Sequence, residues 1–170
     1  MKKRVRQAQR GDKEALLQLV FERKDEYFRL AYSYLRHEED AMDVLEDMIV
    51  ILYEKIDRLK KPESFYSWSK TILVNQCHDM LRKRKKLTVT DEIHEQSDDQ
   101  EGANTVHKLD VQKHLDQLNN EQREAIQLRY WLDYDYVTIA QLTKVPIGTV
   151  KSRISFGLKK LKSYLGGEYL

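Results

Sequence analysis

The sequence predicts an all-α protein made of two small helical domains joined by a polar linker. Three observations support this fold class. The 170 residues include only six glycines and two prolines, so few positions interrupt a helix. Apolar residues recur at helical spacing in two blocks, which lie on either side of a polar stretch that lacks this spacing. The apolar content of 41% is enough for a core in one domain or in two.

Three helices are predicted in the first block, residues 1–86. The apolar stripe after Gly11 predicts one long helix that ends near Leu35, with Asp12 as its cap. A second stripe runs over residues 44–59, between an acidic break and the stop signal Lys60-Lys61-Pro62. A third helix is expected to begin near Ser64, to reach Leu81 and to dissolve into the basic run that follows.

Residues 87–105 have no hydrophobic period and are rich in acids, Ser, Gly and Asn, which predicts a flexible polar linker. The second block, residues 106–170, is again predicted to be helical throughout. Asn119-Asn120 and the segment from Asp133 to Asp135 indicate two turns, each with a capping side chain before the next helix.

From Tyr136 the pattern is typical of a helix-turn-helix, with a tight break at Lys144-Val145-Pro146. Ile139, Ala140, Val150 and Ile154 are predicted to pack its two helices together. The second helix would then expose hydroxyl and cationic side chains, which suit DNA phosphates and base acceptors. These side chains are Thr149, Lys151, Ser152, Arg153 and Ser155. A pair of amphipathic helices with a basic face and no DNA partner would show the same pattern, so this reading stays open.

Charge and composition exclude other classes of protein. The net charge is only +2, but basic runs at 2–4, 82–86 and 159–162 are separated from acids at 38–47 and 91–101, which predicts at least two kinds of partner surface. A single cysteine and the lack of an apolar amino-terminal or membrane-spanning run predict a cytoplasmic protein without disulfides. Five scattered histidines and the absence of a glycine-rich phosphate loop predict no enzyme, metal or cofactor.

Two groups of residues carry a resemblance to a known family. Gly148-Thr149-Val150-Lys151-Ser152-Arg153 and Leu128-Arg129-Tyr130 resemble region four of the RNA polymerase sigma factors of the extracytoplasmic-function class. Asp40-Ala41, Phe65-Tyr66-Ser67-Trp68 and Leu81-Arg82 resemble region two of the same class, in the expected order. The resemblance covers nearly the whole chain and implies a promoter-recognising subunit that has no catalysis of its own.

The resemblance also implies three sets of site residues. Aromatic rings and cations in region two suit unstacked bases and phosphates, and the helix after them would read the minus-ten element. That set is Lys60, Lys61, Phe65, Tyr66, Trp68, Asn75, Asp79, Arg82 and Lys83. The minus-thirty-five element would be read by Thr149, Lys151, Ser152, Arg153 and Ser155, and the polymerase clamp helices would bind Asp40, Asp43, Glu46 and Asp47. Core packing of Phe65 and Trp68, and a merely solvated acidic face, remain alternatives.

Two departures from the family concern the helix-turn-helix. Thr143 and Lys144 stand where the family writes a leucine and a turn glycine, and Val137-Thr138 replace an acidic pair, so the turn geometry is expected to differ. The implied partners are core RNA polymerase, promoter DNA and an anti-sigma factor, and the implied trigger is a stress or envelope signal. The alternatives are a stand-alone repressor or activator, which would bind duplex DNA by itself as a symmetric dimer, and a pure interaction module.

Overall fold

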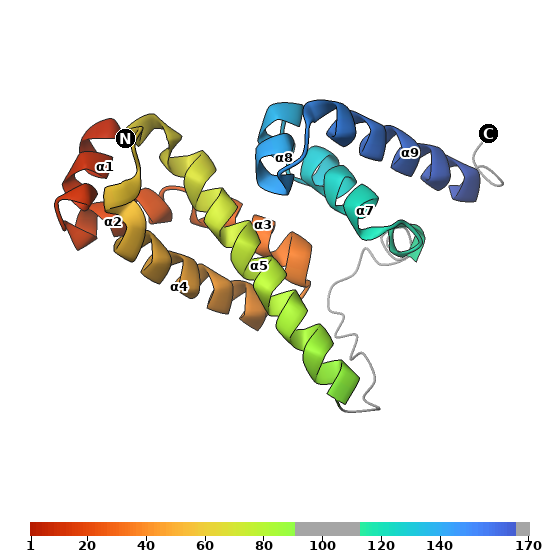
Figure 1. Ribbon diagram of the computed structural model, residues 1–170, viewed down its shortest axis with the longest axis horizontal. Coiled ribbons are helices and arrows are strands. Elements are labelled where there is room, and N and C mark those ends of the chain that lie inside the picture. Colours follow the sequence, from red (N-terminus) through yellow and green to blue (C-terminus); the bar gives the residue numbers. More distant parts are fainter. Residues whose placement is uncertain (91–112, 166–170) are drawn as a thin grey trace. The chain divides into compact units, whose positions relative to one another are not determined.

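The computed structural model describes residues 1–90 and 113–165, and every regular element within these ranges is a helix (Figure 1). The chain divides into two compact units, Met1–Thr90 and Asp91–Leu170. The predicted all-α fold with two small domains is therefore confirmed. None of the helices in the described ranges is both long and apolar enough to cross a membrane.

The first unit is a bundle in which α3, α4 and α5 pack against one another and α1 lies on α2 (Figure 1). Its elements are α1 (Lys2–Gln9), α2 (Lys13–Phe21), α3 (Lys24–Leu35), α4 (Glu38–Lys55), the short 3₁₀ helices η1 (Ile56–Arg58) and η2 (Pro62–Ser64), and α5 (Phe65–Thr90). The fully buried side chains of Tyr27, Leu30, Met48, Leu52, Phe65 and Leu73 form its core. Asp12 caps α2 by accepting a hydrogen bond from the amide of Ala15, as the sequence predicts.

The predicted single helix from Gly11 to Leu35 is wrong, because the chain turns at Glu22 and Arg23. Arg23 has φ −127° and ψ 19°, outside the helical region, so α3 starts as a separate helix. Leu19 before the turn and Tyr27 after it are both fully buried. The apolar stripe thus continues through the break, and its period does not reveal the turn.

Both ends of the first unit also differ from the prediction. Helix α1 was not expected, because its sequence is dominated by cations, yet Val5 and Ala8 are buried at helical spacing. Helix α5 does not dissolve in the basic run but continues to Thr90, since Lys and Arg are good helix formers. The predicted linker therefore overlaps the end of α5 at residues 87–90, and its remainder, 91–105, lies outside the described residues.

The second unit contains α7 (Asn120–Ile126), the π-helical turn η3 (Gln127–Trp131), α8 (Tyr136–Thr143) and α9 (Ile147–Leu165). Asn119 caps α7 by accepting from the Gln122 amide at 2.8 Å, and Asp135 caps α8 by accepting from the Thr138 amide at 2.7 Å. Both caps confirm the turns predicted from the sequence. The first part of the predicted block, residues 106–112, lies outside the described residues.

Packing in the second unit brings α9 close to α7. Leu115, Leu118 and Ile126 form a buried cluster against Leu161. Gly157 lies at the crossing, and a Cβ atom there would be 2.6 Å from Cδ1 of Ile126, so a larger residue would require the end of the Ile126 side chain to move. Arg123 fixes the preceding turn, because its guanidinium donates to the carbonyls of Leu115, Asp116 and Leu118.

Candidate nucleic-acid interface

The helix-turn-helix closes around a lysine in the left-handed backbone region. Lys144 has φ 57° and ψ 37°, the conformation for which a glycine is usually chosen. The Val145 amide donates to the carbonyl of Ala140 at 3.2 Å, and the carbonyl of Pro146 accepts from the amides of Thr149 and Val150. Lys144 thus adopts the backbone conformation that a turn glycine would provide, and the difference expected from the absence of the glycine is not seen at this residue.

Helix α9 presents the predicted polar face, but its five members differ in exposure. Lys151, Ser152 and Ser155 are exposed, whereas Thr149 and Arg153 are half-buried beside the buried Val150 and Ile154. The hydroxyl of Ser152 donates to the carbonyls of Gly148 and Thr149, both at 3.0 Å. Lys151 is therefore the most freely presented cation of the predicted set.

Two residues that were not predicted as site residues lie next to this face. Lys151 Nζ is 5.7 Å from the centre of the Tyr136 ring, and the Arg129 guanidinium is 5.5 Å from the same centre. Cations at such distances are attracted to the ring. Tyr136 therefore attracts two positive charges near the start of α9; its place in the sequence fits the region four resemblance, but nothing local signals its contacts with these cations.

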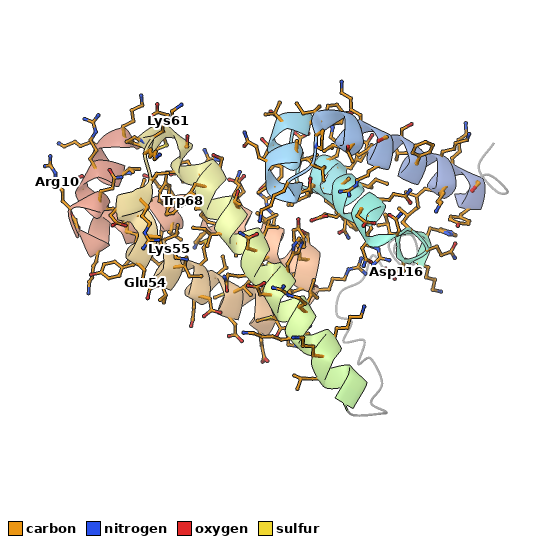
Figure 2. All side chains as sticks on the ribbon, viewed as in Figure 1. Arg10, Glu54, Lys55, Lys61, Trp68 and Asp116 are labelled. Carbon is orange, nitrogen blue, oxygen red and sulfur yellow. The ribbon has the colours of Figure 1, made fainter. Side chains whose placement is uncertain are left out.

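The aromatic group of the first unit is less exposed than the sequence suggested. Phe65 has no exposed surface and lies in the core, so a DNA contact by this residue, as predicted, does not fit the structure. Tyr66 is half-buried, its hydroxyl donates to Glu22 at 2.8 Å, and the Arg23 guanidinium lies 4.7 Å from its ring centre. Trp68, labelled on α5 in Figure 2, is also half-buried, which leaves part of its ring accessible.

Lys60 and Lys61 are exposed on the loop between η1 and η2. A side chain from α1 holds the start of this loop: the Gln9 amide group donates to the carbonyl of Ile56 at 3.1 Å and to that of Leu59 at 2.8 Å. Sequence reasoning missed Gln9, because its two acceptors are about fifty residues away along the chain and nothing local signals them.

The outer part of α5 carries the rest of the predicted minus-ten set. Asn75 and Asp79 are half-buried, whereas Arg82 and Lys83 are exposed. Their spacing places them along one side of the helix. Asp79 forms an ion pair with Arg82, so this carboxylate offsets part of the positive charge on that side.

The acidic side of α4 is only partly available for a partner. Asp43, Glu46 and Asp47 are exposed, but Asp40 is half-buried. The carboxylate of Asp40 pairs with Arg84 of α5 and lies 3.4 Å from Nδ1 of His37. Asp40 therefore links α4 to α5 within the unit, and three acidic side chains remain on the open face.

An ion pair between Glu26 and Lys70 joins α3 to α5, and Arg23 at the start of α3 adds a second cation to Glu26. Glu26 lies 2.5 Å from Lys70 and 3.0 Å from Arg23. Burial acts to raise the pKa of Glu26, but hydrogen bonds and charges from Lys70 and Arg23 outweigh it and the pKa is lowered. The buried hydroxyls of Tyr27 and Ser69, 2.6 Å apart, form a second link between these helices.

No catalytic or metal site is visible in the part of the chain that the structure describes. Burial raises the pKa of the Cys77 thiol to about 12, so it is not a thiolate at neutral pH. Among the described residues, no group of three His, Cys, Asp or Glu side chains has the arrangement of a metal site. The interface therefore offers binding surfaces, made of cations, hydroxyls and partly exposed rings.

Comparison with known proteins finds a matching family model for each of the two units. The family model described as Sigma-70 region 2 matches residues 19–87, and the model described as Sigma-70, region 4 matches residues 108–161. This chain belongs to the sigma-70 family. The RNA polymerase sigma factor SigV of Bacillus subtilis (strain 168) is 30% identical over 158 residues, which cover 93% of this chain and 95% of SigV.

Other relatives place this sigma-70 protein in the extracytoplasmic-function class, as its motifs predict. The ECF RNA polymerase sigma factor SigW of Bacillus subtilis (strain 168) is 27% identical over 97% of this chain and 96% of its own length. Among solved structures, the sigma factor RpoE in complex with the anti-sigma factor NepR from Bartonella quintana has a TM-score of 0.72 and 26% identity. That match covers 89% of this chain and 97% of RpoE.

The two family matches include every predicted site residue of this sigma factor. All of the predicted minus-ten and polymerase-binding residues lie within the region 2 match, and all of the minus-thirty-five residues lie within the region 4 match. Helix α1 lies before the region 2 match. Gln9 therefore belongs to a part of the unit that the family model does not describe.

Proposed function

We propose that this sigma factor binds core RNA polymerase, recognises minus-ten and minus-thirty-five promoter elements and initiates transcription. The observation that carries the proposal is the presence of region 2 and region 4 in one chain, in the order of the family, with a separate core in each unit. A stand-alone repressor would need region 4 alone, and nothing found among the relatives favours that alternative. Catalysis belongs to the polymerase.

The minus-thirty-five element is assigned to α9. Lys151, Ser152 and Ser155 are free to enter a major groove, and Thr149 and Arg153 flank them at the edge of the core. A good base contact contributes about 1–3 kcal/mol of discrimination between base pairs. Tyr136 keeps the cations of Lys151 and Arg129 close to the groove side of the turn.

The minus-ten element and strand separation are assigned to the first unit. Lys60 and Lys61 would bind phosphates, Trp68 and Tyr66 would offer ring surface to unstacked bases, and the exposed side of α5 would read the upstream edge through Asn75, Asp79, Arg82 and Lys83. Phe65 supports these residues from the core. Stacking on an aromatic side chain is worth about 1–3 kcal/mol per base.

The remaining partners bind other surfaces. Asp43, Glu46 and Asp47 form an exposed acidic face suited to a basic surface of core polymerase, and complementary charge would speed docking. The likeness to RpoE, whose structure was solved with the anti-sigma factor NepR, supports regulation of this protein by an anti-sigma factor. A stress or envelope signal would release the sigma factor from that partner. We place the protein in the cytoplasm, because its polymerase and promoters are there.

Run-off transcription with purified core polymerase tests the proposal. We compare Lys151→Ala with Lys113→Ala, since each removes one exposed cation from the second unit. Start-site-specific transcripts that require the protein are expected, and Lys151→Ala should weaken them only on templates with an intact minus-thirty-five element. Absence of such transcripts with polymerase that is active with another sigma factor, together with a duplex-DNA shift by the protein alone, would favour the repressor.

A further inference from the structure

Helix α1 has a basic face that the region 2 and region 4 assignments leave unused. Lys3 and Arg6 of α1 and its C-cap Arg10 follow one another at spacings of three and four residues, so they lie toward one side of the helix, and all three are exposed. Val5 and Ala8 are buried on the opposite side. Figure 2 shows Arg10 pointing away from the unit at its outer edge.

The other cations of α1 are used within the unit. Lys2 lies 3.9 Å from Glu63, and Arg4 pairs with Glu22. Among the described residues, no acidic side chain forms an ion pair with Lys3, Arg6 or Arg10. We call these three cations the α1 basic face.

The charges of the α1 basic face have opposing effects on the stability of α1. Lys3 lies in the first turn, where the positive end of the helix dipole disfavours a cation, whereas Arg6 in the last turn and Arg10 at the C-cap lie at the negative end, which favours cations. Like charges three or four residues apart repel each other by a few tenths of a kcal/mol per pair, roughly the reverse of an attractive pair. A negatively charged partner lying against the α1 basic face would relieve this repulsion.

The position of α1 identifies the partner. Gln9 hydrogen-bonds to the carbonyls of Ile56 and Leu59, and α1 also contacts η2. Helix α1, which carries the basic face, is therefore held against the segment that contains the loop with Lys60 and Lys61. Figure 2 shows Lys61 on the same side of the unit as α1.

We propose that the α1 basic face binds the phosphate backbone of promoter DNA next to the minus-ten element. This inference rests on the proposed function, since it extends the DNA surface of region 2 beyond the residues that the family model matches. Long cationic side chains on a rigid helix suit phosphates, which attract them regardless of base sequence. The contact would add affinity without changing which promoter is chosen.

The test measures the salt dependence of promoter binding by holoenzyme. Arg6→Gln/Arg10→Gln removes two cations of the α1 basic face, Arg6→Lys/Arg10→Lys keeps both charges, and Lys24→Gln/Arg29→Gln removes two exposed cations from α3 as a matched control. Each phosphate contact contributes about 0.9 to the slope of log affinity against log salt. The first variant should therefore lower the slope by about 1.8, to the same extent on promoters that differ in minus-ten sequence.

Three results overturn the inference: an unchanged slope in Arg6→Gln/Arg10→Gln, an equal change in the α3 control, or a loss that depends on the minus-ten sequence. Retention of the slope by Arg6→Lys/Arg10→Lys supports a charge contact, since a structural role for the arginine shape would not survive this exchange. Failure of the wild-type holoenzyme to bind promoters would instead overturn the proposed function. Circular dichroism and binding to core polymerase verify that each variant is folded.

Discussion

At the scale of single residues, Lys144 has a left-handed backbone conformation that the helix-turn-helix requires and that any residue with a Cβ atom disfavours. A left-handed conformation, which Lys144 adopts, costs a non-glycine residue about 1–2 kcal/mol. Replacement by glycine removes this cost, but part of the resulting stabilisation is lost because glycine has greater conformational freedom in the unfolded chain. Lys144→Gly should therefore raise the free energy of unfolding of the second unit by about 0.5–1 kcal/mol. Urea denaturation measures the change.

Lys144→Ala is the control for that prediction, because it removes the lysine side chain and keeps the Cβ atom. It should not stabilise the unit. If alanine stabilises as much as glycine, the gain comes from loss of the lysine side chain and not from backbone strain.

Glu26 makes the stability of the first unit depend on pH. Its pKa is lowered in the folded protein: burial opposes the charge, but Lys70 and Arg23 favour it more strongly. The unfolded chain then binds the proton more readily, so the contribution of Glu26 is present above the ordinary glutamate pKa and is lost as the pH falls through the lowered value. The difference in unfolding free energy between the wild type and Glu26→Gln should shrink on acidification.

Urea denaturation at a series of pH values measures that difference, with Asp25→Asn as the control because Asp25 is exposed on the same turn of α3. A constant difference between wild type and Glu26→Gln from neutral to acid pH would show that the ion pairs of Glu26 do not stabilise the fold.

At the scale of elements, α1 positions the loop that carries Lys60 and Lys61. Gln9→Ala removes both hydrogen bonds to the carbonyls of Ile56 and Leu59, so the loop gains freedom while α1 stays packed through Val5 and Ala8. We expect Gln9→Ala to slow promoter opening several-fold, since each hydrogen bond contributes roughly 1 kcal/mol. A fluorescent base in the minus-ten element reports the opening rate.

Gln7→Ala is the matched control, because Gln7 is exposed on the same helix and its substitution changes helix propensity equally. A template with a mismatched, already open minus-ten element should restore the activity of Gln9→Ala. Lack of restoration, or an equal defect in Gln7→Ala, would contradict a positioning role for Gln9.

At the scale of the whole molecule, each unit has its own buried core. The first is centred on residues such as Tyr27 and Met48, and the second includes the cluster of Leu115, Leu118 and Ile126. Fragments 1–90 and 113–170 should therefore fold separately, each with helical circular dichroism and a cooperative thermal transition. The linker composition also predicts that limited proteolysis of the full chain cuts first between the two units. A fragment that stays unfolded would show that its core needs the other unit.

The sequence predicted the parts of this architecture that depend on local patterns. Asp12, Asn119 and Asp135 mark the starts of helices, because each side chain accepts a hydrogen bond from a backbone amide three residues further along the chain. The helix-turn-helix is predicted by the apolar spacing around Pro146. These signals lie within a few residues, so they can be read without the fold.

The features that the sequence did not reveal depend on contacts between distant segments. The apolar stripe continues through the turn at Arg23, so the break between α2 and α3 leaves the period intact. The burial of Phe65 and the two hydrogen bonds of Gln9 depend on which helices meet. A family motif fixes the order of residues, but it does not state which of them face solvent.

The exposed outer end of α5 has a consequence for how promoter preference can evolve. Arg82 and Lys83 are exposed at this end of the helix, so substitutions of these two residues remove little packing. Asn75 and Asp79 of the proposed minus-ten set are half-buried, as are Thr149 and Arg153 of the proposed minus-thirty-five set. If the proposed function holds, promoter preference can drift through Arg82 and Lys83 with little loss of stability, whereas changes at the half-buried positions of either helix are constrained by packing.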